Sequence, residues 1–210
     1  MSPTAPVSSV VLATHNPKKL AELRRIVAAS GLEVAVLGLD DVASYPEPAE
    51  TEPTFEGNAL IKARAAVAVT GLPALADDSG LEVDVLNGMP GVRTARWAGA
   101  KASDEENRRL LLAQIDDVHD DARGARFVCC LALVLPDGTE EVVRADWPGR
   151  IAHEESGDQG FGYDPIFVAE GQAVTNAELS AEEKDALSHR GRAVRAMVER
   201  LRLLGAEEEQ

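Results

Sequence analysis

Strand-like and helix-like segments alternate through the first 76 residues, and this alternation restricts the possible folds more than any other feature of the sequence. The β-branched segment at 8–14 leads directly into 15–31, where apolar side chains recur at helical spacing and Gly31 ends the helix. The pattern continues with a strand at 32–38, a helix at 54–71 between Thr54 as N-cap and Gly71, and a strand at 73–76. Such alternation predicts an α/β fold.

The second half of the chain adds a different kind of strand pairing. Two capping boxes, each a serine followed three residues later by a glutamate, predict helices that begin after Ser103 and after Ser180. Two strand-like runs flank a Pro-Asp-Gly turn at 136–138, which predicts a β-hairpin, and a further short strand is predicted at 161–168. We therefore expect a mixed α/β fold with the hairpin in its second lobe.

Composition is that of one globular domain. With 45% hydrophobic residues, 210 residues can bury a sizeable core, so we expect a single domain over 1–210 with two lobes and a solvated acidic tail at 205–210. No apolar run approaches the roughly 18 residues of a membrane span, and the N-terminus lacks the pattern of a signal peptide. We expect a cytoplasmic protein without a membrane partner. Cys129 and Cys130 lie in an apolar run and predict buried free thiols.

The charge restricts the class of partner. The chain carries 36 acidic and 21 basic residues, a formal net charge of −15. Such a balance argues against a broad nucleic-acid surface. A small anionic substrate would need basic residues that gather locally, or a divalent cation.

A polar turn connects the first predicted strand to its helix. Thr14, Asn16, Lys18 and Lys19 lie at this turn, and a helix N-terminus offers free backbone N–H groups to a phosphate. The turn is neither a Walker A loop nor a GxGxxG fingerprint, which argues against P-loop hydrolysis and nicotinamide chemistry. Taken alone, it is better explained as an ordinary N-cap followed by surface lysines.

Two consecutive carboxylates, Asp77 and Asp78, follow the strand predicted at 73–76, at the edge where open α/β sheets bind ligands. Consecutive side chains of a strand point in opposite directions, so one carboxylate could face a cleft while the other braces the turn. Carboxylate oxygens hold Mg²⁺, which bridges substrate phosphates. A turn capped locally by one of these residues is an equally good explanation of "DDSG" alone.

Two later segments carry side chains that suit a nucleotide base. The segment "GDQGFGYDPIF" combines glycines with aromatic rings, which can stack on a base, although a glycine-rich loop that enters a core strand is the simpler alternative. In "EKDALSHRG", Lys184 can neutralise a phosphate, and His189 and Arg190 can donate hydrogen bonds to the carbonyl edge of a base. A solvated basic turn is the ordinary alternative. All these clusters are predicted at loop edges, which favours a shared function.

Five motifs occur in order along nearly the whole chain: "THNPKK", "FEGNALIKA", "ADDSGLEVDVLNGMPGVRTARW", "GFGYDPIF" and "AELSAEEKDALSHRG". Together they resemble the inosine/xanthosine triphosphate pyrophosphatase family. The resemblance implies an elongated mixed central β-sheet flanked by helices, two lobes with a substrate cleft between them, and a homodimer. It also implies Mg²⁺-dependent hydrolysis of ITP, dITP, XTP and dXTP to the nucleoside monophosphate and pyrophosphate, which cleanses the nucleotide pool.

The resemblance also assigns roles by position. It implies Asp78 as catalytic carboxylate and metal ligand, Asp77 as its supporting catalytic residue, and Glu50 as a second metal ligand with Glu47 as the alternative. His15 stands where a small residue is expected in many relatives, and it either crowds the phosphate turn or adds a donor. The implied substrate-binding residues are Thr14, His15, Asn16, Lys19, Lys62, Ser79, Phe161, Gly162, Tyr163, Asp164, Lys184, His189 and Arg190.

The chemistry of the implied substrates agrees with these assignments. Hypoxanthine and xanthine carry a carbonyl at C6 where adenine has an amino group, so donors from His189, Arg190 or the backbone would reject adenine. Guanine shares the carbonyl and would have to be excluded at C2. We expect water to attack the α-phosphorus, with Lys19, Lys62, Lys184, Arg190 and Mg²⁺ forming a basic cleft in an acidic protein.

Other functions remain open at this point. One is a metal-dependent hydrolase of pyrimidine or ordinary nucleoside triphosphates, which a substrate panel would separate. Another is a nucleotide sensor that binds ITP without turnover. A scaffold protein would leave the clustered polar residues unexplained.

Overall fold

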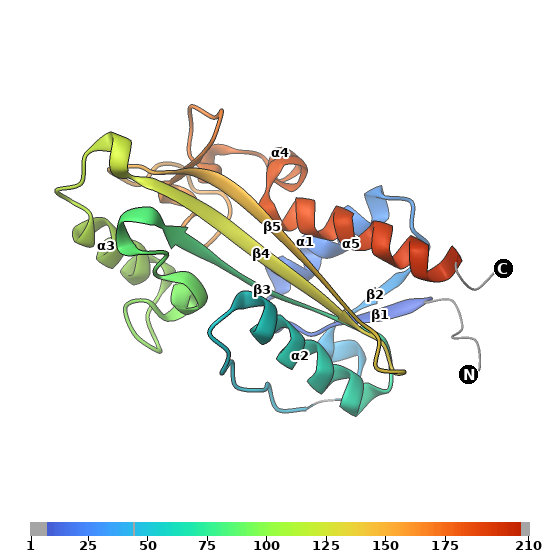
Figure 1. The fold of residues 1–210 in the computed structure, drawn as a ribbon. Helices are drawn as coiled ribbons and strands as arrows, with labels where there is room; N and C mark the ends of the chain where they lie inside the picture. The colour runs from blue at the N-terminus through green and yellow to red at the C-terminus, as the bar shows by residue number, and fades with distance from the viewer. Residues whose placement is uncertain (1–7, 44, 207–210) are drawn as a thin grey trace. The chain divides into compact units, whose positions relative to one another are not determined.

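The computed structural model describes residues 8–43 and 45–206. Its strands form one six-stranded sheet in the order β2-β1-β3-β4-β5-β6 (Figure 1). Strand β1 pairs in parallel with β2 and β3, whereas β5 and β6 are antiparallel, so the predicted mixed sheet is confirmed. The strands are β1 (Ser9–Leu12), β2 (Ala35–Leu37), β3 (Ala74–Val83), β4 (Gly124–Val134), β5 (Glu140–Ile151) and β6 (Phe167–Ala169).

The helices begin where the sequence predicts them. Thr54 and Gly71 cap the second helix, with Gly71 in the left-handed conformation that favours glycine. Ser103 and Ser180 both form the predicted capping boxes. The helices are α1 (Pro17–Ala29), α2 (Phe55–Thr70), α3 (Asp104–Gln114), α4 (Ala181–Leu187) and α5 (His189–Ala206).

The chain forms two compact units. The first unit consists of Met1–Asp78, Cys130–Arg144 and Arg190–Gln210, and the second of Ser79–Cys129 and Ala145–His189. Strands β3, β4 and β5 contribute residues to both units. The predicted substrate cleft between two lobes stays a prediction.

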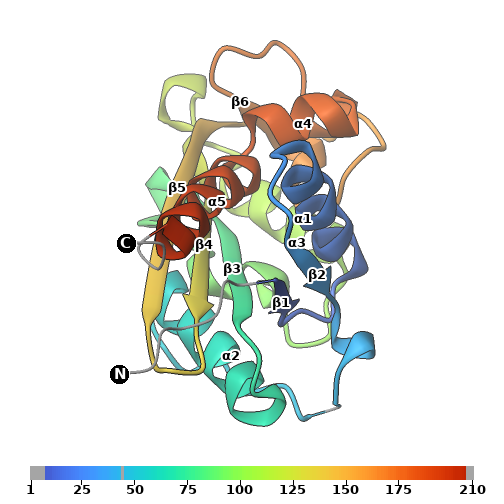
Figure 2. The ribbon, with the colours of Figure 1, turned by 90° about the vertical axis from the view of Figure 1, so that its right-hand side faces the viewer.

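In the first unit, helix α2 packs closely on the strands because its buried side chains are small. Ala59, Ala63 and Ala66 recur at helical spacing and share an apolar cluster with Val11 of β1 and Ala76 of β3. Figures 1 and 2 show α2 on one face of the unit's strands and α1 and α5 on the other. Alternate side chains of β3 therefore meet different helices.

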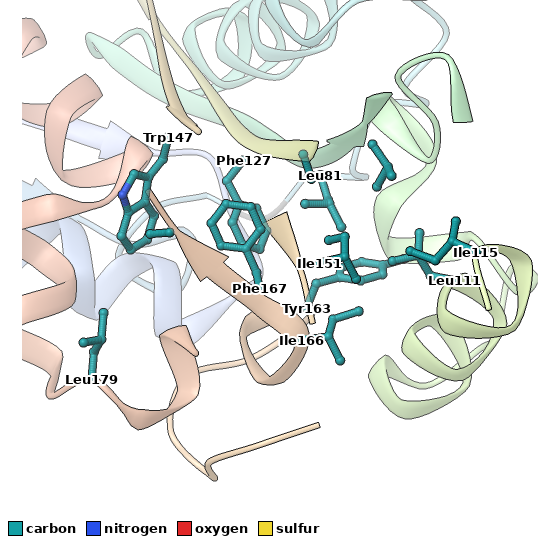
Figure 3. Close-up of a cluster of buried hydrophobic side chains, with 13 residues drawn as sticks. Leu81, Leu111, Ile115, Phe127, Trp147, Ile151, Tyr163, Ile166, Phe167 and Leu179 are labelled. Atoms are coloured by element: carbon teal, nitrogen blue, oxygen red, sulfur yellow. The ribbon is translucent and has the colours of Figure 1, made fainter. Parts of the chain in front are cut away.

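The second unit has a larger, aromatic core (Figure 3). Phe127 of β4, Trp147 of β5 and Phe167 of β6 pack there with Leu81 of β3 and with Tyr163. The Phe127 and Phe167 ring centroids are 4.6 Å apart and tilted, which is a favourable arrangement for two aromatic rings. This core fixes the loops that carry the remaining candidate residues.

The hairpin and the thiols agree with the sequence. Strands β4 and β5 flank the Pro-Asp-Gly turn at 136–138, where Gly138 has a φ of 92° and its N–H donates to the carbonyl of Leu135. Cys129 and Cys130 are both buried and free. The predicted hairpin and the predicted buried thiols are confirmed, but the expectation that the hairpin lies in the second lobe is wrong, because its turn belongs to Cys130–Arg144 of the first unit.

Three local predictions differ from the structure. Strand β3 does not end before Asp77 but continues to Val83. The strand predicted at 161–168 is largely a turn and a 3-10 helix, and only Phe167–Ala169 pairs with β5. Helix α5 extends through Ala206, so the predicted tail at 205–210 begins inside it, and residues 207–210 lie outside the described part of the chain.

Among the helices described, none combines the length and the apolar character required to cross a membrane.

Candidate active site

Asp77 and Asp78 lie inside strand β3, and both side chains are buried. Charged carboxylates in such a position are costly unless cations and hydrogen bonds compensate for the lost water. Because they are consecutive in an extended strand, their side chains leave on opposite faces. Each carboxylate therefore gathers its own set of partners from the first unit.

Asp77 accepts its partners from α1 and α5. Lys19 Nζ lies 2.8 Å from Asp77 Oδ2, and Arg190 Nη2 lies 3.6 Å from the same oxygen. Arg190 also donates through Nη1 to Glu22, a buried carboxylate of α1. Burial alone would raise the pKa of Asp77, but the charges of Lys19 and Arg190 hold that pKa well below its usual range. Asp77 is thus a permanent anion.

Asp78 faces α2. Lys62 Nζ donates to Asp78 Oδ1 at 3.0 Å, and Asn58 Nδ2 donates to Oδ2 at 3.3 Å. Lys62 also donates to Glu50 Oε1 at 3.0 Å, so two carboxylates share one ammonium. Burial raises the pKa of Asp78 and the nearby Glu50 charge raises it further, which outweighs the opposing effect of Lys62. The pKa of Lys62 is itself raised, because the surrounding carboxylates outweigh its burial.

The two neighbouring carboxylates therefore have pKa values displaced in opposite directions. Such a separation assigns different chemistry to the two members of a pair. Asp77 suits a counter-ion that fixes Lys19 and Arg190. Asp78, with its raised pKa, suits a group that accepts a proton.

The turn before α1 caps the helix and also positions Lys19. Asn16 Oδ1 accepts from the backbone N–H of Lys18 at 2.9 Å and of Lys19 at 3.4 Å, while Thr14 Oγ1 accepts from Asn16 N–H at 3.2 Å. The expectation of surface lysines is wrong for Lys19, because its ammonium reaches buried Asp77. Thr14 and Asn16 thus shape the turn that aims Lys19 into the sheet.

The structure separates the two candidates for the second acidic ligand. Glu50 joins Asp78 through Lys62. Glu47 instead lies 4.0 Å from His15, and both of these side chains are more than half exposed. The geometry favours Glu50, and it places His15 beside Glu47 at the surface of the turn.

In the second unit, Asp164 holds the glycine-rich loop. Lys184 Nζ donates to Asp164 Oδ2 at 2.6 Å, and Phe161 N–H donates to the same oxygen at 2.8 Å. Asn176 Nδ2 donates to Oδ1 at 3.4 Å. Lys184 Nζ also lies 4.8 Å from the centroid of the Phe161 ring, which is a cation–π geometry. These contacts of Asp164, which we call the clamp on the glycine-rich loop, place the half-buried Phe161 ring beside Lys184.

Tyr163 and Gly162 have structural contacts in this loop. The Tyr163 ring lies in the aromatic core, its hydroxyl donates to the carbonyl of Thr94 at 2.9 Å, and burial raises its pKa. Gly162 N–H donates to Asp104 Oδ2 at 2.8 Å, and its carbonyl accepts from Arg108 at 2.8 Å. Of the two loop aromatics, Tyr163 is thus part of the core, whereas Phe161 is half-buried.

His189 begins helix α5, and its side chain is buried against the aromatic core of the second unit. Its ring is nearly parallel to that of Phe127, with centroids 4.9 Å apart. It follows Ser188, which is the C-cap residue of helix α4. Ser79, the residue after Asp78 in β3, is half-buried.

The sequence cluster Lys184, His189 and Arg190 is divided in space. Lys184 and His189 belong to the second unit, whereas Arg190 binds Glu22 and Asp77 in the first. The expected basic cleft stays a prediction, and in the structure each of the four side-chain cations assigned to it is paired with a carboxylate. The pairs are Lys19 with Asp77, Lys62 with Asp78 and Glu50, Lys184 with Asp164, and Arg190 with Glu22.

Sequence reasoning missed two residues of the first unit. Glu22 is three residues after Lys19 in α1 and lies next to the buried Leu23, an unusual position for a carboxylate. Asn58 precedes Lys62 by four residues, which places both on one face of α2. A polar residue within an otherwise apolar helical face was the available signal in both cases.

The chain is similar in sequence to known proteins. The sequence model of the Ham1 family matches residues 10–200. A protein of Nocardia farcinica named dITP/XTP pyrophosphatase is 56% identical over 199 residues, covering 94% of this chain and 97% of that protein. A protein of Cutibacterium acnes with the same name is 57% identical over 194 residues, covering 91% of this chain and 95% of that protein.

Solved structures agree with the sequence relatives. A nucleoside-triphosphatase / dITP/XTP pyrophosphatase from Mycobacterium abscessus matches with a TM-score of 0.75 at 56% identity, covering 90% of this chain and 98% of that one. A HAM1 protein from Coxiella burnetii matches with a TM-score of 0.84 at 42% identity, covering 92% and 98%. The predicted fold class and the family resemblance are confirmed, and the chain belongs to the Ham1 family.

Proposed function

We propose that this protein hydrolyses dITP and XTP, together with ITP and dXTP, to the nucleoside monophosphate and pyrophosphate. The predicted enzyme class, a nucleoside triphosphate pyrophosphatase, is confirmed by the names of relatives that are 55–58% identical over most of the chain. The observation that carries the chemistry is the pair of buried carboxylates with oppositely displaced pKa values, each in contact with a cation.

The donor set fits Mg²⁺. Within residues 8–43 and 45–206, no three His, Cys, Asp or Glu side chains gather as a ready metal site. However, Mg²⁺ that bridges substrate phosphates needs only one or two carboxylates and keeps several waters. Glu50 and Asp78 already approach one cationic atom, Lys62 Nζ, to 3.0 Å each. We propose that these two carboxylates hold the metal, which when bound would neutralise charge on the phosphate oxygens.

The residues of the first unit would bind the triphosphate by exchanging partners. Lys19 and Lys62 each hold a carboxylate in the substrate-free protein. Phosphate oxygens are the same kind of acceptor, so each ammonium can turn to the substrate if another cation stays with its carboxylate. Arg190 would remain with Asp77, and the metal would neutralise Asp78. Paired cations also keep the buried site stable before substrate binds.

Asp78 would then act on water. It accepts a proton from a water molecule as the water oxygen forms a bond to the α-phosphorus. The bond between the α-phosphorus and the bridging oxygen breaks, and its electron pair leaves with pyrophosphate. Asp78 has two carboxylate oxygens, so one can accept this proton while the other would hold the metal.

The second unit would recognise the base. Phe161 offers a ring face next to Lys184, and His189 can donate to the C6 carbonyl that hypoxanthine and xanthine share. Adenine would present an amino donor to the same group, which leaves two donors facing each other. Arg190 instead belongs with the residues that would bind the phosphates, because its guanidinium contacts Asp77 and Glu22.

The experiment that tests the proposal is pyrophosphate release from dITP, XTP, ITP, dATP, dGTP and dUTP, with Mg²⁺ and with a chelator. The proposal expects release from dITP, XTP and ITP with Mg²⁺ only, and its loss in Asp78→Asn. Equal release from dATP would show an unselective hydrolase. Tight ITP binding without release would show a sensor. The predicted homodimer and cytoplasmic location are further proposals, which sedimentation and cell fractionation would test.

A further inference from the structure

The His189 imidazole is stacked on an aromatic ring that sequence reasoning did not single out. Phe127 of β4 lies with its ring centroid 4.9 Å from that of His189, and the two planes differ by only 6°. Trp147 of β5 lies farther away, at 6.2 Å and 26°. All three side chains are buried in the second unit. Phe127 is therefore the ring in closest parallel contact with His189.

A parallel contact of this kind determines where a histidine can donate. Both ring N–H vectors of an imidazole lie in the plane of the ring. Rotation about the Cβ–Cγ bond tilts that plane, and a tilt would drive the imidazole edge into the Phe127 face. The torsion at this bond is otherwise broad, so without a neighbouring ring the donor direction would vary.

Phe127 is itself held in place. Phe167 packs against it with centroids 4.6 Å apart at an interplanar angle of 58°, and Trp147 packs against Phe167 at 6.0 Å (Figure 3). Phe127 can thus act as a rigid platform. Phe167 supports this platform from a tilted position that leaves the parallel contact with His189 to Phe127.

We propose that Phe127 is a specificity-determining positioning residue, which fixes the plane of the His189 imidazole and thereby directs its N–H toward the C6 carbonyl of the base. This inference rests on the proposed function, in which His189 binds that carbonyl. A donor aligned in advance loses less conformational freedom on binding, and this gain applies only to substrates that carry the carbonyl.

The test compares Phe127→Met with Phe167→Met. Methionine has nearly the volume of phenylalanine but is flexible and has no plane, so both variants retain the packing and only the first releases His189. We expect Phe127→Met to raise KM for dITP about 10-fold with kcat unchanged within about 2-fold, the pattern for a lost binding hydrogen bond. The ratio of kcat/KM for dITP to that for dATP should fall about 10-fold. Phe167→Met keeps the Phe127 ring and loses only a support of it, so this variant should lower the ratio far less than Phe127→Met does.

A second measurement does not depend on the variants. In the wild-type protein, the ring current of Phe127 should displace the imidazole C–H proton signals of His189 upfield from those of the other three of the chain's four histidines. In Phe127→Met this displacement should shrink to the smaller contribution of Trp147, whose ring centroid lies 6.2 Å from that of His189.

The possible failures are distinguishable. If wild-type protein releases no pyrophosphate from dITP, the proposed function fails. If wild-type protein is selective but both methionine variants change the selectivity equally, Phe127 has only a packing role and the inference is overturned. Absence of the upfield displacement in wild-type protein would also overturn it, whether or not either variant folds.

Discussion

Asp77 and Asp78 are consecutive in β3, yet Asp77 lies 2.8 Å from Lys19 of α1 while Asp78 lies 3.0 Å from Lys62 of α2. The alternation of a strand thus delivers one carboxylate to each helical layer of the first unit. On one face the cations outweigh burial, and on the other burial outweighs the cation. Two identical side chains thereby acquire pKa values that are displaced in opposite directions.

Substituting each carboxylate should separate catalysis from stability. Asp78→Asn should reduce kcat for dITP about 1,000-fold, because the amide cannot accept the proton of water. Its melting temperature should change little, because Lys62 keeps Glu50 as a partner. Asp77→Asn should instead lower the melting temperature by about 6–12 °C, since it leaves Lys19 and Arg190 without their shared counter-ion. Pyrophosphate assays and thermal unfolding of both variants check this, and a stability loss confined to Asp78→Asn would contradict the assignment.

The stability that Asp77 contributes should depend on pH. Its folded-state pKa is lowered from the ordinary 3.8, so the folded protein binds its proton less readily than the unfolded chain. The contribution is therefore complete above pH 3.8 and is lost as the pH falls through the folded-state pKa. Wild-type protein and Asp77→Asn should differ most near neutral pH and converge in acid. Urea unfolding of both proteins across this range measures the difference, and a constant gap down to the most acidic pH would refute it.

Lys62 should compete with Mg²⁺ in the substrate-free protein. Its ammonium lies 3.0 Å from one carboxylate oxygen of Glu50 and 3.0 Å from one of Asp78. Lys62 is therefore a cation at the position that we propose for the metal. Lys62→Met removes this cation and leaves two carboxylates that Mg²⁺ can bind. At constant ionic strength, MgCl₂ should therefore raise the melting temperature of Lys62→Met more than that of wild-type protein.

The matched control for this experiment is the double variant with Lys62→Met and Glu50→Gln. It keeps Asp78 but lacks the second carboxylate, and it should lose most of the gain from MgCl₂. If wild-type protein and Lys62→Met respond equally to MgCl₂, Lys62 does not occupy the position of the metal.

The clamp on the glycine-rich loop can be tested by two alanine substitutions. Gly160 and Gly162 both have positive φ angles, 76° and 61°, so alanine strains the backbone at either position. A Cβ at Gly160 would lie 2.2 Å from Asp164 Oδ2, whereas a Cβ at Gly162 meets nothing within 4 Å. Gly160→Ala should therefore lower the melting temperature more than Gly162→Ala and should raise KM for dITP. Equal effects of the two substitutions would show that backbone strain alone is responsible.

The local signals in the sequence were sufficient for most element boundaries. Thr54, Ser103 and Ser180 cap helices because their hydroxyl oxygens accept the free backbone N–H groups of the first turn, which is a contact between near neighbours in the chain. The Pro-Asp-Gly hairpin turn is local in the same sense. Such features can be predicted because every interacting group lies within a few residues.

The buried charges could not be located in this way. In the sequence, the two consecutive carboxylates Asp77 and Asp78 look like the end of a strand. They are stable inside β3 only because cations from α1, α2 and α5 pair with them, and these partners are distant in the sequence. Arg190 and His189 were predicted to recognise the base together, but in the structure Arg190 binds Glu22 and Asp77 of the first unit, whereas His189 stacks on Phe127 of the second. The hydrogen bond from the Tyr163 hydroxyl to the carbonyl of Thr94 was also not predicted from the sequence, and the role of Tyr163 at the substrate stays a prediction. Each of these outcomes depends on pairing between residues distant in the sequence.

The fate of a labelled water oxygen shows which phosphorus atom of the substrate is attacked. Hydrolysis of dITP in ¹⁸O-labelled water should place the label in dIMP and leave pyrophosphate unlabelled, because the account predicts attack at the α-phosphorus. Label in pyrophosphate would show attack at the β-phosphorus, and release of labelled phosphate with dIDP would show attack at the γ-phosphorus. Either of these results would contradict the account.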